Sequence, residues 1–149
     1  MNELNKARSL CSLEAVEHLY VVLRGEIIGH NVGTQFSVAC PEGVQVKDAV
    51  IVHNHPYDDE DQSRHRLSFG DVISAAFDNA LAIEAIWGNR YIRAERPAQG
   101  WPDPDTDERW IMFGLEQFLG VRSNNGFDID HQRMLGIRVT SGTYERTVS

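Results

Sequence analysis

The hydrophobic and polar positions along the first third of the chain predict one helix followed by strands. Apolar residues recur at helical spacing between residues 3 and 18, which predicts a first helix. The segment 19–25, LYVVLRG, is a dense β-branched and aromatic run, which is typical of a strand. The segment 26–33, EIIGHNVG, is expected to pair with it through a tight turn near Gly25. The segment 48–54, DAVIVHN, is a continuous apolar run, the pattern of a strand buried on both faces.

The middle of the chain combines another apolar pattern with a long polar loop. Residues 34–41, TQFSVACP, alternate between apolar and polar positions, which suggests a further strand. The loop from Pro56 to Leu67 is too polar for a core. A helix is expected to begin at Ser68, with one apolar face formed by Val72, Ile73, Ala76, Phe77 and Ala80.

The last third of the chain predicts a hairpin and two helices. Segments 82–88 and 91–97 are expected to form strands around a turn at Gly88-Asn89, followed by a loop rich in Pro, Gly and Asp. The segment 108–121 predicts a helix whose apolar residues include Trp110, Phe113, Leu115 and Phe118. Residues 128–139 predict a last helix, and residues 142–148 a short strand or tail. Helices and strands intermix, so we expect a single α/β or α+β domain with a central mixed sheet flanked by helices.

Composition and charge narrow the range of partners. The 149 residues are 42% hydrophobic, which suits one domain with one core. The formal net charge is −8 and no segment collects Lys and Arg, so no double-stranded nucleic acid partner is expected. No apolar run approaches the ~20 residues that span a bilayer, and the first residues lack a basic-then-apolar signal pattern, so we expect a cytoplasmic protein with no membrane association. Cys11 and Cys40 form no Cys-x-x-Cys pair, and both are interpreted as small buried apolar residues.

The residues with the clearest chemistry stand at the end of the apolar run 48–54. His53 and His55 are separated by one residue, and strand side chains alternate with period 2, so both imidazoles point to the same face. Pro56 cannot extend a ladder and ends the strand there. Neutral imidazoles are favourable zinc ligands, and a catalytic zinc takes a third protein ligand, often a carboxylate.

Asp71 is a plausible third ligand, because it lies in the first turn of the helix that follows the loop after His55. Ser68 stands three residues before it. Ser-x-x-Asp is also a capping box, in which the serine caps the helix and the aspartate reaches back to the serine backbone. The two interpretations of this motif are compatible, and both remain open.

The combination of His53-Asn54-His55-Pro56 with Ser68-x-x-Asp71 resembles the signature of the JAB/JAMM (MPN-plus) zinc metallopeptidases. The family pattern is an upstream Glu, then His-x-His-Pro, a loop, and Ser-x-x-Asp. Glu17, in AVEHLYVVLRG, stands where the family places its Glu, near the end of the first helix. The HNHP form with an upstream Glu-His pair looks most like the JAB-type domains of phage head-morphogenesis and toxin-associated proteins. The resemblance covers about residues 10–80, and the helical extension at about 105–149 carries no matching motif.

The resemblance implies an MPN/cytidine-deaminase-like fold and a hydrolase that cleaves an amide, peptide or isopeptide bond in a protein or peptide substrate. Zinc would be held by His53, His55 and Asp71. Glu17 would be the general base and Ser68 the hydrogen-bond donor to the oxyanion. A phage or mobile-element origin is implied in the same way.

Two departures from the family pattern leave alternatives. The loop 56–67 is longer than the usual spacer, and besides a solvated loop it could form a flap, or His65 or Asp61 could replace a ligand. Glu26, at a turn beyond the first strand, competes with Glu17 for the role of base, although a solvated hairpin position is expected for it.

Two other function classes stay open, and several residues have simpler interpretations. The chain could be a catalytically silent binding or assembly module of the MPN type, or a metal-dependent phosphoesterase, which usually recruits more His and Asp ligands downstream than His131 alone. His18 and His30 are expected to be core or surface histidines, and His131 to be exposed on its helix. Asn54 points away from the two histidines and is expected to be structural. The three tryptophans are expected to anchor core or loops, although Trp101 could line a substrate groove.

Overall fold

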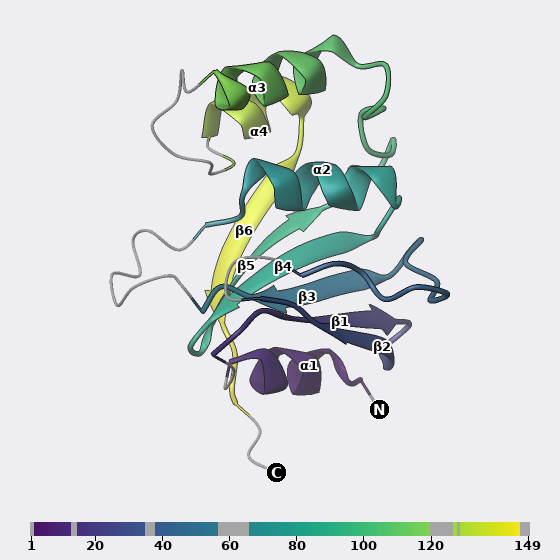
Figure 1. Ribbon diagram of the computed structural model, residues 1–149, viewed down its shortest axis with the longest axis vertical. Coiled ribbons are helices and arrows are strands. Elements are labelled where there is room, and N and C mark those ends of the chain that lie inside the picture. Colours follow the sequence, from purple (N-terminus) through teal and green to yellow (C-terminus); the bar gives the residue numbers. More distant parts are fainter. Residues whose placement is uncertain are drawn as a thin grey trace.

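The computed structural model describes residues 2–12, 15–34, 38–56, 66–119, 127 and 129–146 (Figure 1). Six strands form one open sheet in the order β2-β1-β3-β4-β5-β6. The elements in chain order are α1 (Leu4–Cys11), β1 (His18–Leu23), β2 (Glu26–Val32), β3 (Val50–Asn54), α2 (Phe69–Phe77), β4 (Ala82–Trp87), β5 (Arg90–Glu95), α3 (Glu108–Phe118), α4 (Ile129–Leu135) and β6 (Arg138–Thr143). The predicted fold class, an α+β domain with a central mixed sheet and flanking helices, is confirmed.

One pair of strands in the sheet is parallel. β3 and β4 run in the same direction, and every other neighbouring pair is antiparallel. A parallel pair needs a crossover, and α2 supplies it on one face of the sheet. The carboxyl ends of β3 and β4 therefore meet at one edge, where the His53-Asn54-His55 segment leaves the sheet.

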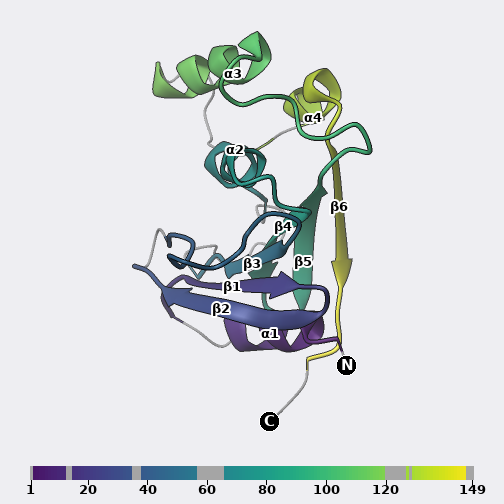
Figure 2. The same ribbon diagram turned by 90° about the vertical axis from the view of Figure 1, so that its right-hand side faces the viewer.

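Helices cover both faces of the central strands. α1 packs on one face with Tyr20, Val22 and Val52, whereas α2 packs on the other with residues such as Val21 and Ile51 (Figure 2). All five residues of β3 are buried, as its continuous apolar run predicted. Because side chains alternate along β3, His53 lies on the α2 face with Ile51, whereas Asn54 lies on the α1 face with Val52.

A buried ion cluster, which the sequence did not suggest, ties α1 to the sheet. Glu84 of β4 is fully buried and accepts two hydrogen bonds from Arg8 of α1, at 2.6 and 2.7 Å. Arg93 of β5 donates to the same carboxylate at 2.6 Å. The Arg8 guanidinium also stacks over the ring of Tyr91 at 4.2 Å. A buried carboxylate needs such partners, and these come from two other elements, α1 and β5.

Several predicted boundaries are wrong. The first helix ends at Cys11 rather than at residue 18, because residues from Val16 onward are held extended beside β2 and β3. Residues 38–41 form no strand, and Val38 and Cys40 instead pack against the α2-side core. The last helix ends at Leu135, where Gly136 adopts a left-handed conformation (φ +67°) that terminates a helix readily, and β6 follows.

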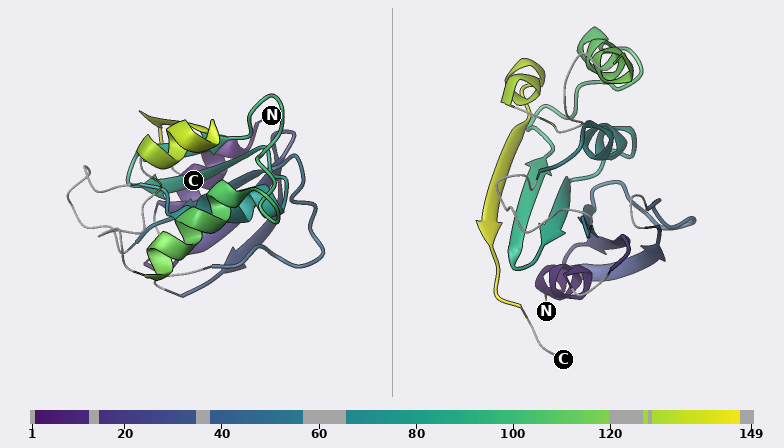
Figure 3. Two further views of the ribbon diagram at one scale, coloured as in Figure 1. Left: turned by 90° about the horizontal axis from the view of Figure 1, so that it is seen from above. Right: turned by 60° about the vertical axis from the view of Figure 1, so that its left-hand side comes forward.

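Two helices leave some of their apolar residues exposed. The predicted apolar face of α2 is confirmed at Val72, Ala76 and Ala80, which are buried, but not at Phe77. In α2 the buried side chains are Phe69, Val72, Ala75 and Ala76, whereas Phe77 is 56% exposed. Among the described side chains of α3, only Trp110 and Phe113 are buried, since these two face Phe69 of α2. Leu115 and Phe118 point away from the core and are 55% and 85% exposed. α3 and α4 lie beyond α2, at the end of the molecule opposite α1 (Figure 3). Within the described residues, no helix has the length and hydropathy that crossing a membrane requires.

Candidate metal centre

The end of β3 brings the two predicted histidines together. His53 pairs with Leu19 of β1 and Ala85 of β4 in the middle of the sheet. His55 follows the strand, and its backbone N–H donates to the carbonyl of Ile86 at 3.1 Å, which holds the chain against β4 for one more residue. Both side chains are 3% exposed, and their Nε2 atoms lie 3.0 Å apart. The prediction that the two imidazoles converge is confirmed.

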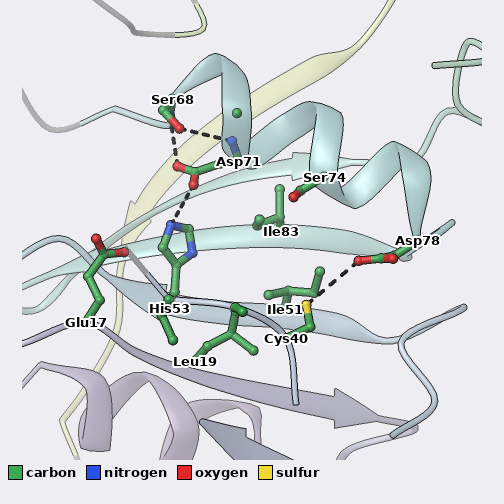
Figure 4. Close-up of a pocket in the computed structure, with 13 residues that line it drawn as sticks. Glu17, Leu19, Cys40, Ile51, His53, Ser68, Asp71, Ser74, Asp78 and Ile83 are labelled. Carbon is green, nitrogen blue, oxygen red and sulfur yellow. Dashed lines mark hydrogen bonds and ion pairs between the residues drawn. The ribbon is translucent and has the colours of Figure 1, made fainter. Parts of the chain in front are cut away.

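Asp71 reaches the histidines from the first turn of α2. Its Oδ1 lies 3.2 Å from Nε2 of His53 (Figure 4). Its Oδ2 lies 3.3 Å from Nε2 of His55. The same residue completes a capping box with Ser68: the Asp71 N–H donates to Ser68 Oγ at 3.0 Å, and the Ser68 N–H donates to Asp71 Oδ2 at 2.9 Å. The capping interpretation of the Ser-x-x-Asp motif is confirmed, and the cap holds the carboxylate where it faces the imidazoles, as the ligand interpretation requires.

The spacing of these atoms suits a four-coordinate zinc ion. Zinc–nitrogen and zinc–oxygen bonds of about 2.0–2.1 Å on a tetrahedron place neighbouring ligand atoms roughly 3.3 Å apart. The two histidine nitrogens lie 3.0 Å apart, and each faces a different oxygen of Asp71, Oδ1 at 3.2 Å from His53 and Oδ2 at 3.3 Å from His55. The residue types are also those of a catalytic zinc site, two neutral imidazoles and a carboxylate. The three side chains thus fit the ion that the motif implies.

Electrostatics at the site also favour a cation. Burial raises the pKa of the Asp71 carboxyl, but the neighbouring His53 and His55 outweigh this effect and hold the pKa well below its usual value. The two Nε2 atoms face each other at 3.0 Å, so no more than one proton fits between them. The Asp71 carboxylate is therefore negative, and the ring nitrogens that face it offer lone pairs to an ion when the imidazoles are neutral. His53 Nδ1, the nitrogen that carries the proton when Nε2 coordinates, is buried and has no hydrogen-bond partner among the described residues.

Glu17 lies beside the histidines, although not at a helix end as predicted. It follows the bend after α1, and its backbone extends the β1–β2 ladder by two hydrogen bonds of 2.8 Å, to Thr34 and from Gly33. Its side chain is 4% exposed, and one donor atom from each of Glu17, His53 and His55 lies within 4.8 Å of the other two. A carboxylate within that distance is close enough either to ligate an ion at the histidines or to contact a water bound to it.

The competing candidates lie elsewhere or outside the described residues. Glu26 is exposed and pairs with Leu23 at the far end of the β1–β2 hairpin, whereas the histidines adjoin Leu19 at the near end. The structure therefore separates Glu26 from the candidate site. Asp61 and His65 belong to the segment 57–65, which lies outside the described residues.

Asn54 holds the backbone on both sides of Glu17. Its Oδ1 accepts from the His18 N–H at 2.6 Å, and its Nδ2 donates to the Val16 carbonyl at 3.0 Å. These bonds fix the backbone on both sides of Glu17. The prediction of a structural role for Asn54 is confirmed.

His131 is buried, which corrects the prediction of an exposed histidine. It is fully inaccessible and lies among three phenylalanine rings, with centroid separations of 4.3 Å to Phe113, 5.6 Å to Phe127 and 5.7 Å to Phe69. The helix containing it packs on α3 through this face, so His131 belongs to the core between the helices. Trp101 donates its indole N–H to the Ala80 carbonyl at 2.7 Å and anchors its loop; it does not line the cavity beside the histidines.

The site opens into a cavity of about 450 Å³ between α2 and the segment 38–40. Cys40 and Asp78 line this cavity together with Glu17, His53, Ser68 and Asp71. Neither Cys40 nor Asp78 belongs to a motif that predicted the site. The sequence carried one signal for Asp78, since Asp71, Ser74 and Asp78 are polar at helical spacing. Cys40 is partly buried and Cys11 fully buried, so the expectation of two buried cysteines holds for Cys11.

The comparisons with known proteins add no relative. No family model matches the sequence, and neither a curated protein nor a solved structure matches the chain. The resemblance to the JAB/JAMM metallopeptidases rests on the motif residues, which the fold places at one end of β3.

Proposed function

We propose that this chain is a zinc-dependent hydrolase that cleaves an amide, peptide or isopeptide bond, in the manner of the JAB/JAMM metallopeptidases. The observation that carries the proposal is the convergence of His53 Nε2, His55 Nε2 and the Asp71 carboxylate at separations of 3.0 to 3.3 Å. These three residues would hold the ion. A zinc ion supplies a bound water of lowered pKa and polarises a carbonyl oxygen.

Glu17 has the position of the general base. Its carboxylate is buried next to the two histidines and lines the same cavity, so it can accept a proton from the attacking water. The water oxygen bonds to the carbonyl carbon while Glu17 takes a proton, which leaves an oxyanion on the tetrahedral carbon. The carbon–nitrogen bond then breaks as Glu17 delivers the proton to the leaving nitrogen. The products are a carboxylic acid and an amine, and no other reactant is needed.

Ser68 has the position of the oxyanion donor. Its Oγ accepts one hydrogen bond, from the Asp71 N–H, and the hydroxyl keeps its own proton to donate. Ser68 lines the cavity beside His53 and Asp71, so this proton can reach a substrate oxygen next to the ion. The capping bond fixes the hydroxyl oxygen before substrate arrives.

Paired variants test the proposed function. Glu17→Gln should retain zinc and lose hydrolysis of an internally quenched peptide library, because the amide keeps the shape of the side chain but cannot take a proton. Glu26→Gln is the matched control and should retain both zinc and activity, since Glu26 lies at the far end of the hairpin. Full activity in Glu17→Gln would contradict the assignment of the base. Zinc binding by the unaltered protein without cleavage of any library member would favour an assembly module.

A further inference from the structure

The cavity beside the candidate metal centre has a distinct polar wall. Its floor is the apolar face of the sheet, formed by Leu19, Ile51 and Ile83 (Figure 4). One wall is α2, and the opposite wall is the segment 38–40. From α2, Asp71, Ser74 and Asp78 face the cavity, at spacings of three and four residues that place them on one side of the helix. The cavity therefore runs along α2, from the metal site at Asp71 to the carboxylate of Asp78.

Asp78 is a negative charge without a described counter-charge. Within the described part of the chain, no Lys or Arg lies within ion-pair distance of it, and none lines the cavity. The guanidinium of Arg96, which reaches Asn79 next to Asp78 in the sequence, is bound to Asp48 at 2.7 Å. Asp78 is also the C-cap of α2, where the helix dipole already places negative charge. The negative end of the helix dipole repels the Asp78 carboxylate. A cation bound there would interact favourably with both the carboxylate and the dipole.

Cys40, on the wall opposite α2, lies next to the carboxylate of Asp78. Cys40 Sγ lies 3.8 Å from Asp78 Oδ2. Burial, followed by the charge of Asp78, raises the pKa of the Cys40 thiol to about 11. The thiol is thus neutral near pH 7, and the negative charge at this end of the cavity belongs to Asp78.

We propose that Asp78 selects substrates that carry a positively charged side chain, Lys or Arg, near the bond to be cleaved. This inference rests on the proposed hydrolase function, because it concerns the substrate of the same site. Asp78 follows Asp71 by seven residues, which corresponds to about 10 Å along the helix axis. An extended peptide advances about 3.3 Å per residue, so the charged residue lies within three residues of the cleaved bond. The apolar floor suits the aliphatic stem of Lys or Arg, whose charged end would reach Asp78.

A peptide series of matched charge tests the proposal on the zinc-loaded protein. Internally quenched peptides of Ala and Gly carry Lys, Gln or Glu at one position, in turn at each of the three residues on either side of the scissile bond. At one of these positions we expect kcat/KM to be roughly tenfold higher for Lys than for Gln, the order of effect of a hydrogen bond to a charged group. Glu should be the poorest of the three. Equal rates for Lys, Gln and Glu at every position would overturn the proposal while leaving the hydrolase function intact.

Charge variants at Asp78 separate selectivity from folding. Asp78→Asn should remove the preference for Lys, and Asp78→Lys should invert it in favour of Glu, an outcome that damage to the fold would not produce. Asp105→Asn is the matched control, because it removes one negative charge from an exposed loop residue that does not line the cavity. Its preference should equal that of the unaltered protein. An unchanged preference in both Asp78 variants would assign the selectivity elsewhere and overturn the role of Asp78.

A binding measurement distinguishes failure of this inference from failure of the proposed function. Zinc-loaded Glu17→Gln should bind the Lys peptide roughly tenfold more tightly than the Glu peptide, and the double variant Glu17→Gln/Asp78→Asn should bind both about equally. If no peptide is cleaved by the unaltered protein but this binding preference appears, the hydrolase function is wrong and the cation-binding role of Asp78 stands. Equal binding of both peptides to Glu17→Gln would contradict that role directly.

Discussion

The contacts that cap α2 also position the Asp71 carboxylate next to the two histidines. The serine oxygen caps α2 by accepting from the Asp71 N–H, and the Asp71 carboxylate both accepts from the Ser68 N–H and faces the two histidines. Helix capping thus orients the candidate ligand. A carboxylate held in this way does not need to be ordered when the ion arrives, which reduces the entropy lost on binding.

Substitutions at Ser68 should separate capping from catalysis. Ser68→Ala should lower the free energy of unfolding by about 1 kcal/mol, whereas Ser68→Gly should lower it by only a few tenths, because glycine is tolerated at an N-cap. Both should reduce kcat by roughly 10²–10³, since neither offers a donor to the oxyanion. Ser68→Thr keeps the hydroxyl and should therefore retain most of the stability and most of the activity. Chemical denaturation and peptide hydrolysis measure the two effects, and parallel losses of activity and stability would contradict a separate catalytic role.

The reactivity of Cys40 reports the charge of Asp78. With a pKa of about 11, only about one thiol in a thousand is ionised at pH 8, because the thiolate is the minor form below the pKa. Iodoacetamide should therefore modify Cys40 slowly at pH 8, at a rate that still rises with pH beyond 9. Asp78→Asn should lower the pKa, increase the thiolate fraction and speed the reaction, as peptide mapping by mass spectrometry would show. An unchanged rate in Asp78→Asn would contradict the electrostatic contact.

At the scale of elements, α1 is held to the sheet by charge as well as by apolar contacts. Arg8 and Arg93 converge on the fully buried Glu84, and each guanidinium is itself largely buried. Glu84→Gln should lower the free energy of unfolding by about 3 kcal/mol, because it removes the charge that both cations face. Glu95→Gln is the control: Glu95 also pairs with Arg93, but it is 57% exposed and should cost less than about 1 kcal/mol. Equal effects in urea denaturation would contradict a special role of the buried carboxylate.

Element types were predictable from the sequence where one periodicity dominated. The continuous run of β3, the hairpin of β4 and β5 around Gly88-Asn89, and the Ser68 cap of α2 all carry strong local signals, and all three were predicted correctly. The end of the first helix was not, because the backbone before β1 is held by hydrogen bonds with Asn54, which is distant in the sequence. Tertiary contacts of this kind override local spacing.

The candidate site was predictable to the extent that its residues stand in short motifs. His-x-His on a strand and Ser-x-x-Asp at a helix start each fix a local geometry, so the convergence of His53, His55 and Asp71 followed once the two segments were placed together. Asp78 and the buried state of His131 were not predicted, since both depend on which neighbouring element covers the helix face. The ion pairs of Glu84 with Arg8 and Arg93 join α1, β4 and β5, and no local sequence pattern predicts ion pairs between such distant segments.

At the scale of the whole molecule, a bound ion should stabilise the fold. The candidate ligands join β3 to α2, and through Glu17 the site adjoins the start of β1. A ligand at 100 times its Kd adds about 2.7 kcal/mol to the free energy of unfolding, which corresponds to an increase in Tm of roughly 5–10 °C for a chain of this size. Differential scanning calorimetry with zinc and after chelation should show this difference. His55→Ala should show none, and an equal shift in that variant would place the stabilising ion elsewhere.

The most direct test of the central claim is the zinc affinity of matched variants, measured by competition with a chromogenic chelator. The unaltered protein and Glu17→Gln should each bind about one zinc ion per chain with similar affinity, because Glu17 is proposed as the base and not as a ligand. His53→Ala, His55→Ala and Asp71→Ala should lose at least about tenfold in affinity, since each removes one of three ligands. Undiminished zinc binding in the two histidine variants, or loss of zinc in Glu17→Gln with retention in Asp71→Ala, would contradict the assignment of His53, His55 and Asp71 as the metal-binding set.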